Sequence, residues 1–270
     1  MIHLIVALPC EARALRHRLR LRSVAHRPFR LYESGTVRLV ISGVGQARAA
    51  AATAWLAGRS AEDTCAWLNL GTAGHALRPL GEGLLAHKVV DAVSGQAWYP
   101  GLAFDPPVST ETVVSVTRPE RDYRHGAAYD MEAAGFCTAA AHFASWELIH
   151  CYKVVSDNRH HPVHAVDEAQ VEDLMSGHLA TIMRLIDTLQ AIAAALDAWT
   201  SPPLLDWMTG RWQFSQTRRA RLARLLQRHH ALGLDTAALQ ARLRYCTTAR
   251  AALDAVETEV NRTARAGLPS

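Results

Sequence analysis

Strand-like and helix-like segments alternate through the first 190 residues, and this alternation constrains the fold more than any other feature of the sequence. Continuous apolar runs such as 2–8 and 65–70 are typical of strands buried on both faces. The segment after the first run has helical spacing of Ala12, Leu15 and Leu19. Strands that alternate with helices usually form parallel sheets covered on both faces. We therefore predict an α/β protein with a three-layer domain around a central, mostly parallel sheet.

The expected elements follow from the same patterns. The strands are expected at 2–8, 28–34, 36–43, 65–70, 83–93, 111–116 and 146–156, with the second and third paired as a hairpin around Gly35. The helices are expected at 10–21, 43–58, 131–144 and 171–196.

The pattern changes near residue 200, where Ser-Pro-Pro interrupts it. Three short helices are expected after this point, over 216–231, 235–246 and 248–264. Gly233 is expected to end the first of them, and Asp235 and Thr247 are expected N-caps of the other two. We predict that the three-layer α/β domain spans 1–198 and that a small, basic, all-α appendage spans 199–270.

Charge is distributed unevenly between these parts. Residues 201–270 contain eleven arginines, no lysine and five acidic residues, which gives this segment a net charge of +6. Residues 1–200 contain the other 18 basic and 20 acidic residues and have a net charge of −2. The helix over 216–231 has arginines on one face and leucines on the other, which fits a packed helix with solvated arginines, and alternatively a dimerisation or partner-docking module. Nucleic-acid binding is not expected, because acidic residues lower the net positive charge of this segment and it contains no known nucleic-acid-binding motif.

Composition excludes several classes of protein. No apolar run approaches the roughly 20 residues of a membrane span. The N-terminal apolar run has no basic leader and is expected to be a buried strand rather than a signal peptide. Five widely spaced cysteines without a CxxC pair favour a reduced, cytoplasmic protein without a disulfide framework or cysteine zinc site.

Ligands of such sheets bind beyond the carboxyl ends of the strands, so the loops there contain the candidate residues. Glu11 follows the first strand at the start of a helix, where a carboxylate can also simply favour the positive end of the helix dipole. Two glycine-rich turns, S-G-V-G-Q over 42–46 and N-L-G-T-A-G over 69–74, offer backbone amides to a ligand. The candidates in these turns are Gly43, Gly45, Thr72, Ala73 and Gly74.

Two later segments contain further acidic residues. Y-D-M-E-A-A over 129–134 places Glu132 at the start of a helix. Y-K-V-V-S-D-N over 152–158 places Asp157 at the end of a strand, four residues after Lys153. These loops are expected to meet at one edge of the sheet.

In this order the segments resemble the nucleoside phosphorylase/nucleosidase superfamily. The likeness is greatest to the 5'-methylthioadenosine/S-adenosylhomocysteine nucleosidases and the related hopanoid-associated phosphorylases. The likeness runs from residue 2 to about 190 and does not cover 201–270. It rests on six segments in the family's order: A-L-P-C-E-A-R-A-L, S-G-V-G-Q-A-R-A-A, L-N-L-G-T-A-G-H-A, G-E-G-L-L-A-H-K-V-V-D, A-A-Y-D-M-E-A-A-G and Y-K-V-V-S-D-N.

The resemblance implies cleavage of a purine N-glycosidic bond through an oxocarbenium-like ribosyl cation. Asp157 matches the acid that protonates N7 of the base, and Ser156 matches the residue that orients it. Glu132 matches the carboxylate that binds the ribose 2' and 3' hydroxyls. Met131 matches the apolar floor under the sugar.

The resemblance also implies how the nucleophile is held. Thr72 replaces the family's serine near the ribose, and Glu11 corresponds to the carboxylate that polarises the attacking water. Gly43 and Gly45 would supply amides nearby. No metal or cofactor is implied, the small-molecule substrate would be a purine nucleoside or a 5'-substituted adenosine, and the protein is expected to be a homo-oligomer with a dimer as the favoured state.

Some positions differ from the family pattern. Lys153 stands where the nucleosidases have an arginine and cannot form a bidentate fork. V-S-V-T-R-P-E over 114–120 replaces the stretch whose phenylalanine stacks on adenine, so that Pro119 falls there. Arg118 and Lys153 could instead bind phosphate in a phosphorylase, which is the first alternative. The second alternative is a catalytically degenerate nucleoside-binding protein whose helical tail docks a partner.

Two further motifs carry less weight. His160, His161 and His164 are spaced like metal ligands, but no acidic or cysteine ligand accompanies them, and we expect a solvated loop near the ligand. The Trp-Tyr-Pro segment over 98–100 is expected either to line a pocket or to contact another subunit.

Overall fold

The computed structural model describes residues 1–60, 64–123, 126–200 and 203–266. The chain divides into two compact units, Met1–Ala193 and Ala194–Ser270. The Ser-Pro pair at 201–202, where the sequence predicts an interruption, lies outside the described residues. The predicted domain boundary between residues 198 and 199 stays a prediction.

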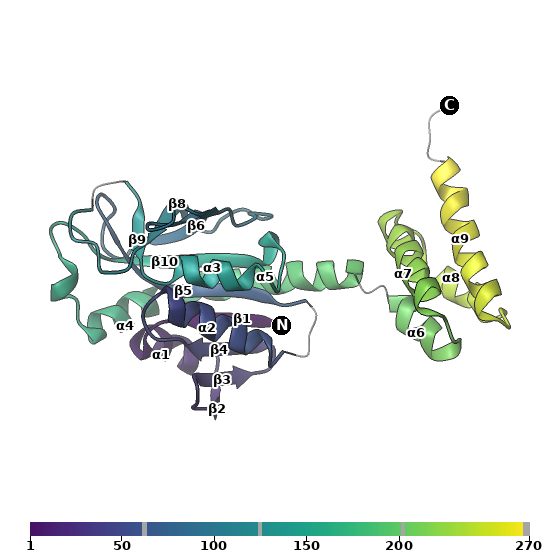
Figure 1. The fold of residues 1–270 in the computed structure, drawn as a ribbon, viewed down its shortest axis with the longest axis horizontal. Coiled ribbons are helices and arrows are strands. Elements are labelled where there is room, and N and C mark those ends of the chain that lie inside the picture. The colour runs from purple at the N-terminus through teal and green to yellow at the C-terminus, as the bar shows by residue number, and fades with distance from the viewer. Residues whose placement is uncertain (61–63, 124–125, 201–202, 267–270) are drawn as a thin grey trace. The chain divides into compact units, whose positions relative to one another are not determined.

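The strands of the first unit form one sheet of ten strands within the described residues (Figure 1). The strand order is β10-β6-β8-β9-β5-β1-β4-β3-β2, β7 pairs with β6, and β10 pairs additionally with β5. Their bounds are β1 Ile2–Val6, β2 Arg22–Ala25, β3 Arg30–Ser34, β4 Val37–Ile41, β5 Ala66–His75, β6 Gly83–Asp91, β7 Ala97–Trp98, β8 Ser109–Ser115, β9 Ala128–Asp130 and β10 Ile149–Asp157.

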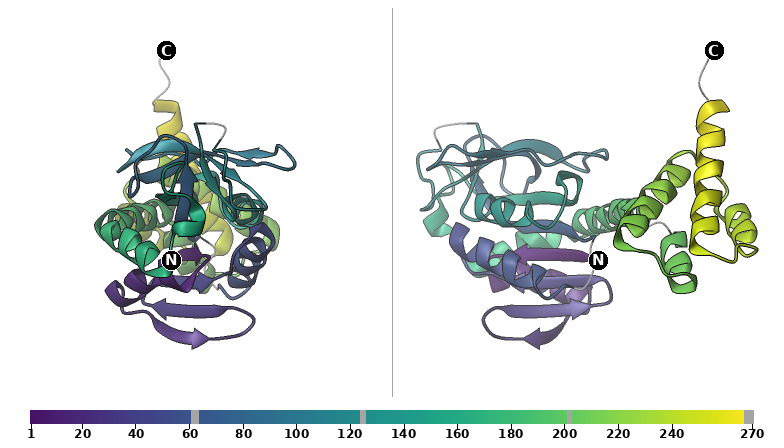
Figure 2. Two further views of the ribbon diagram at one scale, coloured as in Figure 1. Left: turned by 90° about the vertical axis from the view of Figure 1, so that its left-hand side faces the viewer. Right: turned by 45° about the vertical axis from the view of Figure 1, so that its right-hand side comes forward.

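The centre of the sheet is parallel, as the alternating pattern predicts. β1 pairs in parallel with β4 on one side and β5 on the other, and β5 pairs in parallel with β10. The crossover through α1 runs from β1 to the edge strand β2, from which two antiparallel connections return the chain through β3 to β4. The crossover through α2 then runs from β4 across β1 to β5. Right-handed crossovers in opposite directions place their helices on opposite faces of the sheet, and Figure 2 shows helices on both sides of the strands.

The expectation of a mostly parallel sheet is only partly correct. The hairpin of β3 and β4 around Gly35 is confirmed and is antiparallel, as are the pairs β10–β6, β5–β9 and β6–β7. The pairings β5–β10, β10–β6, β6–β8, β8–β9 and β9–β5 return to the starting strand. This half of the sheet is therefore closed on itself and mixed, because the chain returns by short connections as well as by helical crossovers.

The helices of the first unit also differ in detail from the prediction. The helix expected over 131–144 is shorter and leaves Met131 and Glu132 in the turn before it. The helix expected over 171–196 is two helices that meet at His178. The bounds are α1 Pro9–Arg18, α2 Gln46–Ala57, α3 Ala133–Ala140, α4 Glu168–Gly177 and α5 Leu179–Thr200.

One helix, α5, has the length and the composition of a membrane span. Residues Leu179–Asp197 of α5 meet both criteria, with a mean hydropathy of 1.5. The buried residues Ile182, Leu185, Ile186 and Leu189 recur at helical spacing along this segment. Such a buried stripe is what a core helix of an α/β domain requires.

The second unit has a core of its own. Its helices are α6 Pro203–Arg211, α7 Gln216–Ala231, α8 Thr236–Leu243 and α9 Ala249–Ala266, of which α6 was not expected. The Asp235 side chain accepts from the amides of Ala237 and Ala238, which confirms this N-cap. The N-cap predicted at Thr247 is wrong by one residue, because Thr248 Oγ1 accepts from the amide of Ala251.

The two faces of α7 agree with the amphipathic pattern. Leu222, Leu225 and Leu226 are buried in the core of this unit. The arginines of α7 are exposed, and Arg221 donates to both carboxylate oxygens of Glu257 on α9, at 2.6 and 2.7 Å. The arginine face is exposed on a helix whose leucines are packed, and a role of this face in dimerisation or partner docking stays a prediction.

Candidate active site

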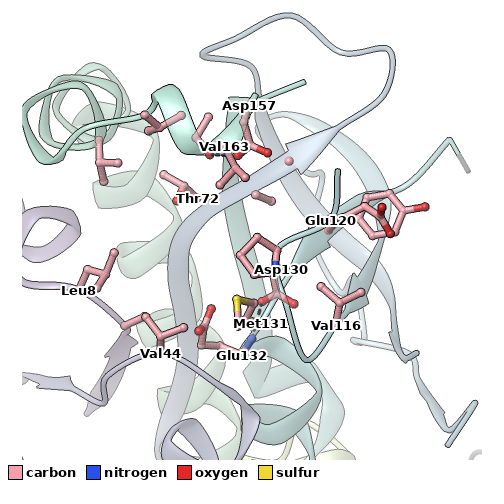
Figure 3. Close-up of a pocket in the computed structure, with 18 of the residues that line it drawn as sticks. Leu8, Val44, Thr72, Val116, Glu120, Asp130, Met131, Glu132, Asp157 and Val163 are labelled. Carbon is pink, nitrogen blue, oxygen red and sulfur yellow. Dashed lines mark hydrogen bonds between the residues drawn. The ribbon is translucent and has the colours of Figure 1, made fainter. Parts of the chain in front are cut away.

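A pocket of about 280 Å³ opens where the carboxyl ends of β1, β5 and β10 meet the turn before α3. In the view of Figure 3, Asp157 and Val163 lie at one end, Glu132 and Met131 at the other, and Thr72 between them. Most of the predicted site residues line it, namely Glu11, Thr72, Ala73, Gly74, Met131, Glu132, Ser156 and Asp157.

Glu11 is held by α1 and by the end of β5. It is the third residue of α1, and its Oε2 accepts from the backbone amide of Leu8 at 2.9 Å, so it caps the helix start. Its Oε1 accepts from the amide of Thr72 at 2.9 Å and from the Thr72 hydroxyl at 3.3 Å. Burial raises the pKa of Glu11, and the hydrogen bonds from the two amides partly oppose this rise. Glu11 therefore both caps the helix and faces the pocket.

Glu132 occupies the turn between β9 and α3. Its Oε1 accepts from the backbone amide of Gly45 at 2.8 Å. Burial raises the pKa of Glu132 to about 7, and the nearby negative charge of Asp130 adds to the rise, whereas Lys153 and the Gly45 amide oppose it. The carboxyl group can thus change its charge near neutral pH.

Asp130, two residues before Glu132, also lines the pocket and was not among the predicted site residues. Lys153 Nζ lies 2.7 Å from Asp130 Oδ2, and both side chains are almost fully buried. Ser115 Oγ donates to Asp130 Oδ1 at 2.6 Å, and the amide of Ala133 donates to Oδ2 at 2.8 Å. A carboxylate with this many donors fixes the turn that presents Glu132.

Lys153 does not line the pocket. Burial lowers the pKa of its amine, but the charges of Asp130 and Glu132 outweigh that effect, so the pKa lies above its ordinary value and the side chain stays charged. Its role as a substrate-binding residue stays a prediction, and its observed contact is with Asp130.

The two glycines of the first turn also lie outside the pocket lining. The Gly43 amide donates to the carbonyl of Ala7 at 3.0 Å, and the Gly45 amide is bound to Glu132. Both have positive φ, +81° and +107°, so the turn needs glycine at these positions. Their amides position protein groups in this structure rather than pointing free toward a ligand.

Both oxygens of Asp157 at the end of β10 accept hydrogen bonds from hydroxyl groups. Ser156 Oγ donates to Oδ1 at 2.6 Å, and the hydroxyl of Tyr123 donates to Oδ2. A Cβ on Gly74 would overlap Asp157 Oδ2, so glycine is required beside this carboxylate. Tyr123 was not predicted, because nothing in the sequence pattern of its loop distinguishes it.

The loop with the unusual sequence 114–120 contributes to the pocket. Val116, Pro119 and Glu120 line it, and Arg118 does not. Tyr129 of β9 also lines the pocket and supplies an aromatic side chain. The loop is therefore part of the site.

The remaining predicted groups lie elsewhere. Among the described residues no group of three His, Cys, Asp or Glu side chains is arranged to hold a metal ion. His161 lines a neighbouring cavity with Ser156 and Val166. Trp98 is buried in β7 and Tyr99 is exposed, with Lys88 Nζ 5.7 Å from the centre of its ring.

No family model and no curated protein sequence matches this chain. Solved structures do match. The 5'-methylthioadenosine nucleosidase of Arabidopsis thaliana in its apo form is 15% identical, with a TM-score of 0.59 over 70% of this chain and 95% of that chain. The 5'-methylthioadenosine/S-adenosylhomocysteine nucleosidase of Helicobacter pylori with butyl-thio-DADMe-Immucillin-A is 11% identical, with a TM-score of 0.58 over 69% and 97%.

The nucleosidase of Neisseria meningitidis in complex with methylthio-immucillin-A is 18% identical, with a TM-score of 0.51 over 65% of this chain and 96% of that chain. Each of these proteins is matched over nearly its whole length. The resemblance predicted from the six sequence segments is thereby confirmed: the chain has the fold of the 5'-methylthioadenosine/S-adenosylhomocysteine nucleosidases, of the nucleoside phosphorylase/nucleosidase type.

Proposed function

We propose that the protein hydrolyses the N-glycosidic bond of a purine nucleoside or a 5'-substituted adenosine. The observation that supports this most is the convergence of Glu11, Glu132 and Asp157 on one pocket from three separate parts of the chain. Glycosidic hydrolysis needs an acid for the leaving group, a group that stabilises the developing sugar cation and an acceptor for the proton of water.

Asp157 is the proposed acid. Its carboxyl group gives a proton to a ring nitrogen of the purine, and the glycosidic bond breaks with its electron pair passing to the base. Ser156 orients the carboxyl group from Oδ1. General acid catalysis of this kind typically contributes about 10²- to 10⁴-fold to the rate.

Glu132 is the proposed ribose-binding carboxylate. In its charged form it accepts hydrogen bonds from the sugar hydroxyls and stabilises the positive charge that develops on the ring. The Asp130–Lys153 ion pair holds the turn on which it stands. Met131 lines the same end of the pocket and supplies apolar contact to the sugar.

Glu11 is the proposed acceptor for the proton of water. The water oxygen bonds to the anomeric carbon, and its proton passes to the Glu11 carboxylate. Thr72 donates to that carboxylate and lines the pocket beside it. The raised pKa of Glu11 makes it a better proton acceptor than an exposed glutamate.

The lining of the pocket favours water over phosphate as the nucleophile. None of the described residues that line it is a lysine or an arginine, and Lys153 is bound to Asp130. A phosphate dianion beside Glu11, Glu132 and Asp157, with Glu120 and Asp130 also in the lining and no lysine or arginine there, would be strongly disfavoured.

The lining also favours a substrate with an apolar substituent. Leu8, Val44, Val163, Val166 and Val171 all contribute apolar surface. The solved structures with this fold include an Asp-to-Asn mutant of the Helicobacter pylori nucleosidase with 5'-methylthioadenosine in the active site. We therefore propose a 5'-thioether of adenosine as the preferred substrate.

We also retain a homo-oligomeric, cytoplasmic protein as part of the proposal. Val44 lines the pocket and is 40% exposed, and Val93 in a neighbouring turn is 75% exposed. Apolar residues exposed beside a pocket are suited to contact with a second subunit. Sedimentation analysis of the full chain tests this: a single monomeric species would contradict it.

The function is tested by release of free base from a panel of nucleosides that includes 5'-methylthioadenosine, with and without inorganic phosphate. The proposal predicts release at the same rate in both conditions. Release that requires phosphate would make the protein a phosphorylase. Binding of a nucleoside in calorimetry without any release would make it a binding protein.

A further inference from the structure

We propose that Tyr123 is a positioning residue for the acid Asp157, an inference that rests on the proposed function. The hydroxyl of Tyr123 donates to Asp157 Oδ2 while Ser156 Oγ donates to Oδ1. Two donors on the two oxygens fix the plane of the carboxyl group. A carboxyl group with a fixed plane presents the proton that it carries in one defined direction, which the proposed function requires to be toward the ring nitrogen of the base.

Tyr123 itself lies outside the lining of the pocket. Its side chain is only 1% exposed, and it approaches Asp157 from the loop between β8 and β9. Asp157 and Ser156 line the pocket, whereas Tyr123 does not. The phenol therefore acts on the substrate through Asp157 and not by contact.

The surrounding residues are arranged to hold this phenol in place. Tyr123 has a φ of +44°, a backbone conformation that residues other than glycine rarely adopt. Arg159 Nη2 donates to the carbonyls of Asp122 and Tyr123 at 3.2 and 3.1 Å, and the Tyr129 ring meets the Tyr123 ring edge to face at 6.2 Å. A guanidinium group and an aromatic ring thus stabilise an otherwise unfavourable backbone.

Gly74 supplies the space that this arrangement requires. A Cβ at this position would lie 2.7 Å from Cε1 of Tyr123 and would overlap the Asp157 carboxylate. The sequence G-T-A-G at the end of β5 therefore accommodates two side chains that hydrogen bond to each other directly above it.

The protonation of the phenol agrees with a donor role. Burial raises the pKa of Tyr123, and its hydrogen bond to Asp157 raises it further, while the backbone amide of Val163 opposes the rise. The phenol accordingly stays protonated through the neutral range and donates to Asp157.

This donor matters most after proton transfer. When Asp157 gives its proton to the base, its carboxyl group becomes a carboxylate, and the hydrogen bond from Tyr123 stabilises the new negative charge. Hydrogen bonds to charged groups are about twice as strong as bonds between neutral groups. The bond therefore strengthens as the glycosidic bond breaks, which lowers the barrier rather than improving substrate binding.

The test compares Tyr123→Phe with the wild type in release of adenine from 5'-methylthioadenosine. Phenylalanine keeps the ring and removes only the hydroxyl. We expect kcat to fall about 10- to 100-fold, as for loss of a hydrogen bond to a charged group, with KM changed by less than about threefold. The matched control is Tyr152→Phe, which removes a buried hydroxyl that contacts His178 away from the pocket, and it should leave both constants unchanged.

Two further measurements separate positioning from general structural support. A nitrophenyl riboside has a leaving group that needs no protonation, so its hydrolysis should be equally fast in Tyr123→Phe and the wild type. In a background of Asp157→Asn, Tyr123→Phe should cause no further loss of kcat, because the two residues act as one unit.

The outcomes distinguish the two proposals. If the wild type releases base and Tyr123→Phe does so at the same rate, the role of Tyr123 is wrong and the proposed function stands. If Tyr123→Phe slows the nitrophenyl riboside as much as the nucleoside, the role is also wrong. If the wild type releases base from no nucleoside, the proposed function fails, and this inference fails with it.

Discussion

Three carboxyl groups of the pocket, those of Glu11, Glu132 and Asp157, have distinct sets of partners, and this allows them to have different roles in one small volume. Glu11 accepts from two backbone amides and one hydroxyl, and Asp157 accepts from two hydroxyls. Glu132 accepts from one amide and lies close to the negative charge of Asp130. Differences of this kind separate the protonation behaviour of neighbouring acids.

The raised pKa of Glu132 predicts how stability depends on pH. Its pKa in the folded protein is about 7 instead of 4.5, so folding favours the protonated form, and the stability associated with it is lost as the pH rises from 4.5 through 7. Glu132→Gln removes this loss. As the pH rises from 4.5 to 7 and above, the free energy of unfolding of the variant should therefore increase relative to that of the wild type by about 3 kcal/mol. This follows from 1.36 kcal/mol for each unit of pKa difference between the folded and unfolded states.

Urea unfolding across this pH range measures the difference. Glu168→Gln is the control, because it makes the same substitution at a residue that is exposed at the start of α4. A difference between Glu132→Gln and the wild type that stays constant from pH 4.5 to 7 would contradict the assigned environment of Glu132.

The sequence identified the carboxylates that follow long apolar runs and missed the residues that hold them in position. Glu11 and Asp157 follow apolar runs, so their positions at one edge of the sheet could be predicted. Asp130 ends a strand of only three residues, too short to produce an alternating pattern. Tyr123 reaches Asp157 from an irregular loop, and the path of such a loop cannot be predicted from local patterns.

At the scale of elements, the pattern predicted the parallel centre of the sheet but not its closure. The buried runs of β1 and β5 are continuous and apolar, which is typical of central parallel strands. β6, β8 and β9 pair through contacts between distant segments, and their sequences contain no information on which neighbour each takes. The mixed half of the sheet therefore emerged only from the structure.

The break between α4 and α5 has a local cause. His178 lies between the helices, where its Nδ1 lies 2.6 Å from the Tyr152 hydroxyl and its Nε2 2.8 Å from the carbonyl of Gly81. These contacts with two other segments hold the residue outside regular helix geometry. Its apolar neighbours on both sides preserve helical spacing, so the sequence alone predicts one helix.

The contact between α2 and α3 predicts a strong effect of a small substitution. A Cβ on Gly135 of α3 would overlap the backbone of Gln46 at the start of α2, within 2.7 Å of its Cα. Gly135→Ala should therefore destabilise the first unit by about 1–3 kcal/mol or more, because backbone must move. It should also slow base release, because α3 follows Glu132 and α2 follows Gly45.

Gly58→Ala is the matched control for this prediction. Gly58 ends α2 in right-handed helical geometry, and an added Cβ would meet only carbonyl oxygens at 3.8 Å, an ordinary contact. Urea unfolding should show no loss of stability for this variant. Equal stability of Gly135→Ala and Gly58→Ala would contradict the close approach of the two helices.

At the scale of the whole molecule, the chain contains two cores. The buried residues of α6 to α9 form a cluster that includes Leu222, Leu239 and Val256, and the pocket is lined only by residues of the first unit. The change of pattern near residue 200 predicted an appendage, because its helices are short and its charge differs from that of the rest.

Separate cores predict separate unfolding. Leu239 is fully buried in the helical unit, and Leu239→Ala should cost that unit about 2–5 kcal/mol. In calorimetry one transition should shift to lower temperature while the other stays in place. Base release measured below both transitions should not change. A common shift of the whole unfolding profile would contradict the division into two units.

The central claim is that Asp157 is the acid of an N-glycosyl hydrolase, and the most direct test is base release from 5'-methylthioadenosine by Asp157→Asn. Asparagine preserves the shape of the side chain and cannot supply the proton. Asp187→Asn is the matched control, because Asp187 is exposed on α5 and does not line the pocket. The account predicts that the rate of base release falls about 10²- to 10⁴-fold in Asp157→Asn while its melting temperature stays unchanged. The control variant should keep full activity. A folded Asp157→Asn protein that releases base at the wild-type rate would contradict it.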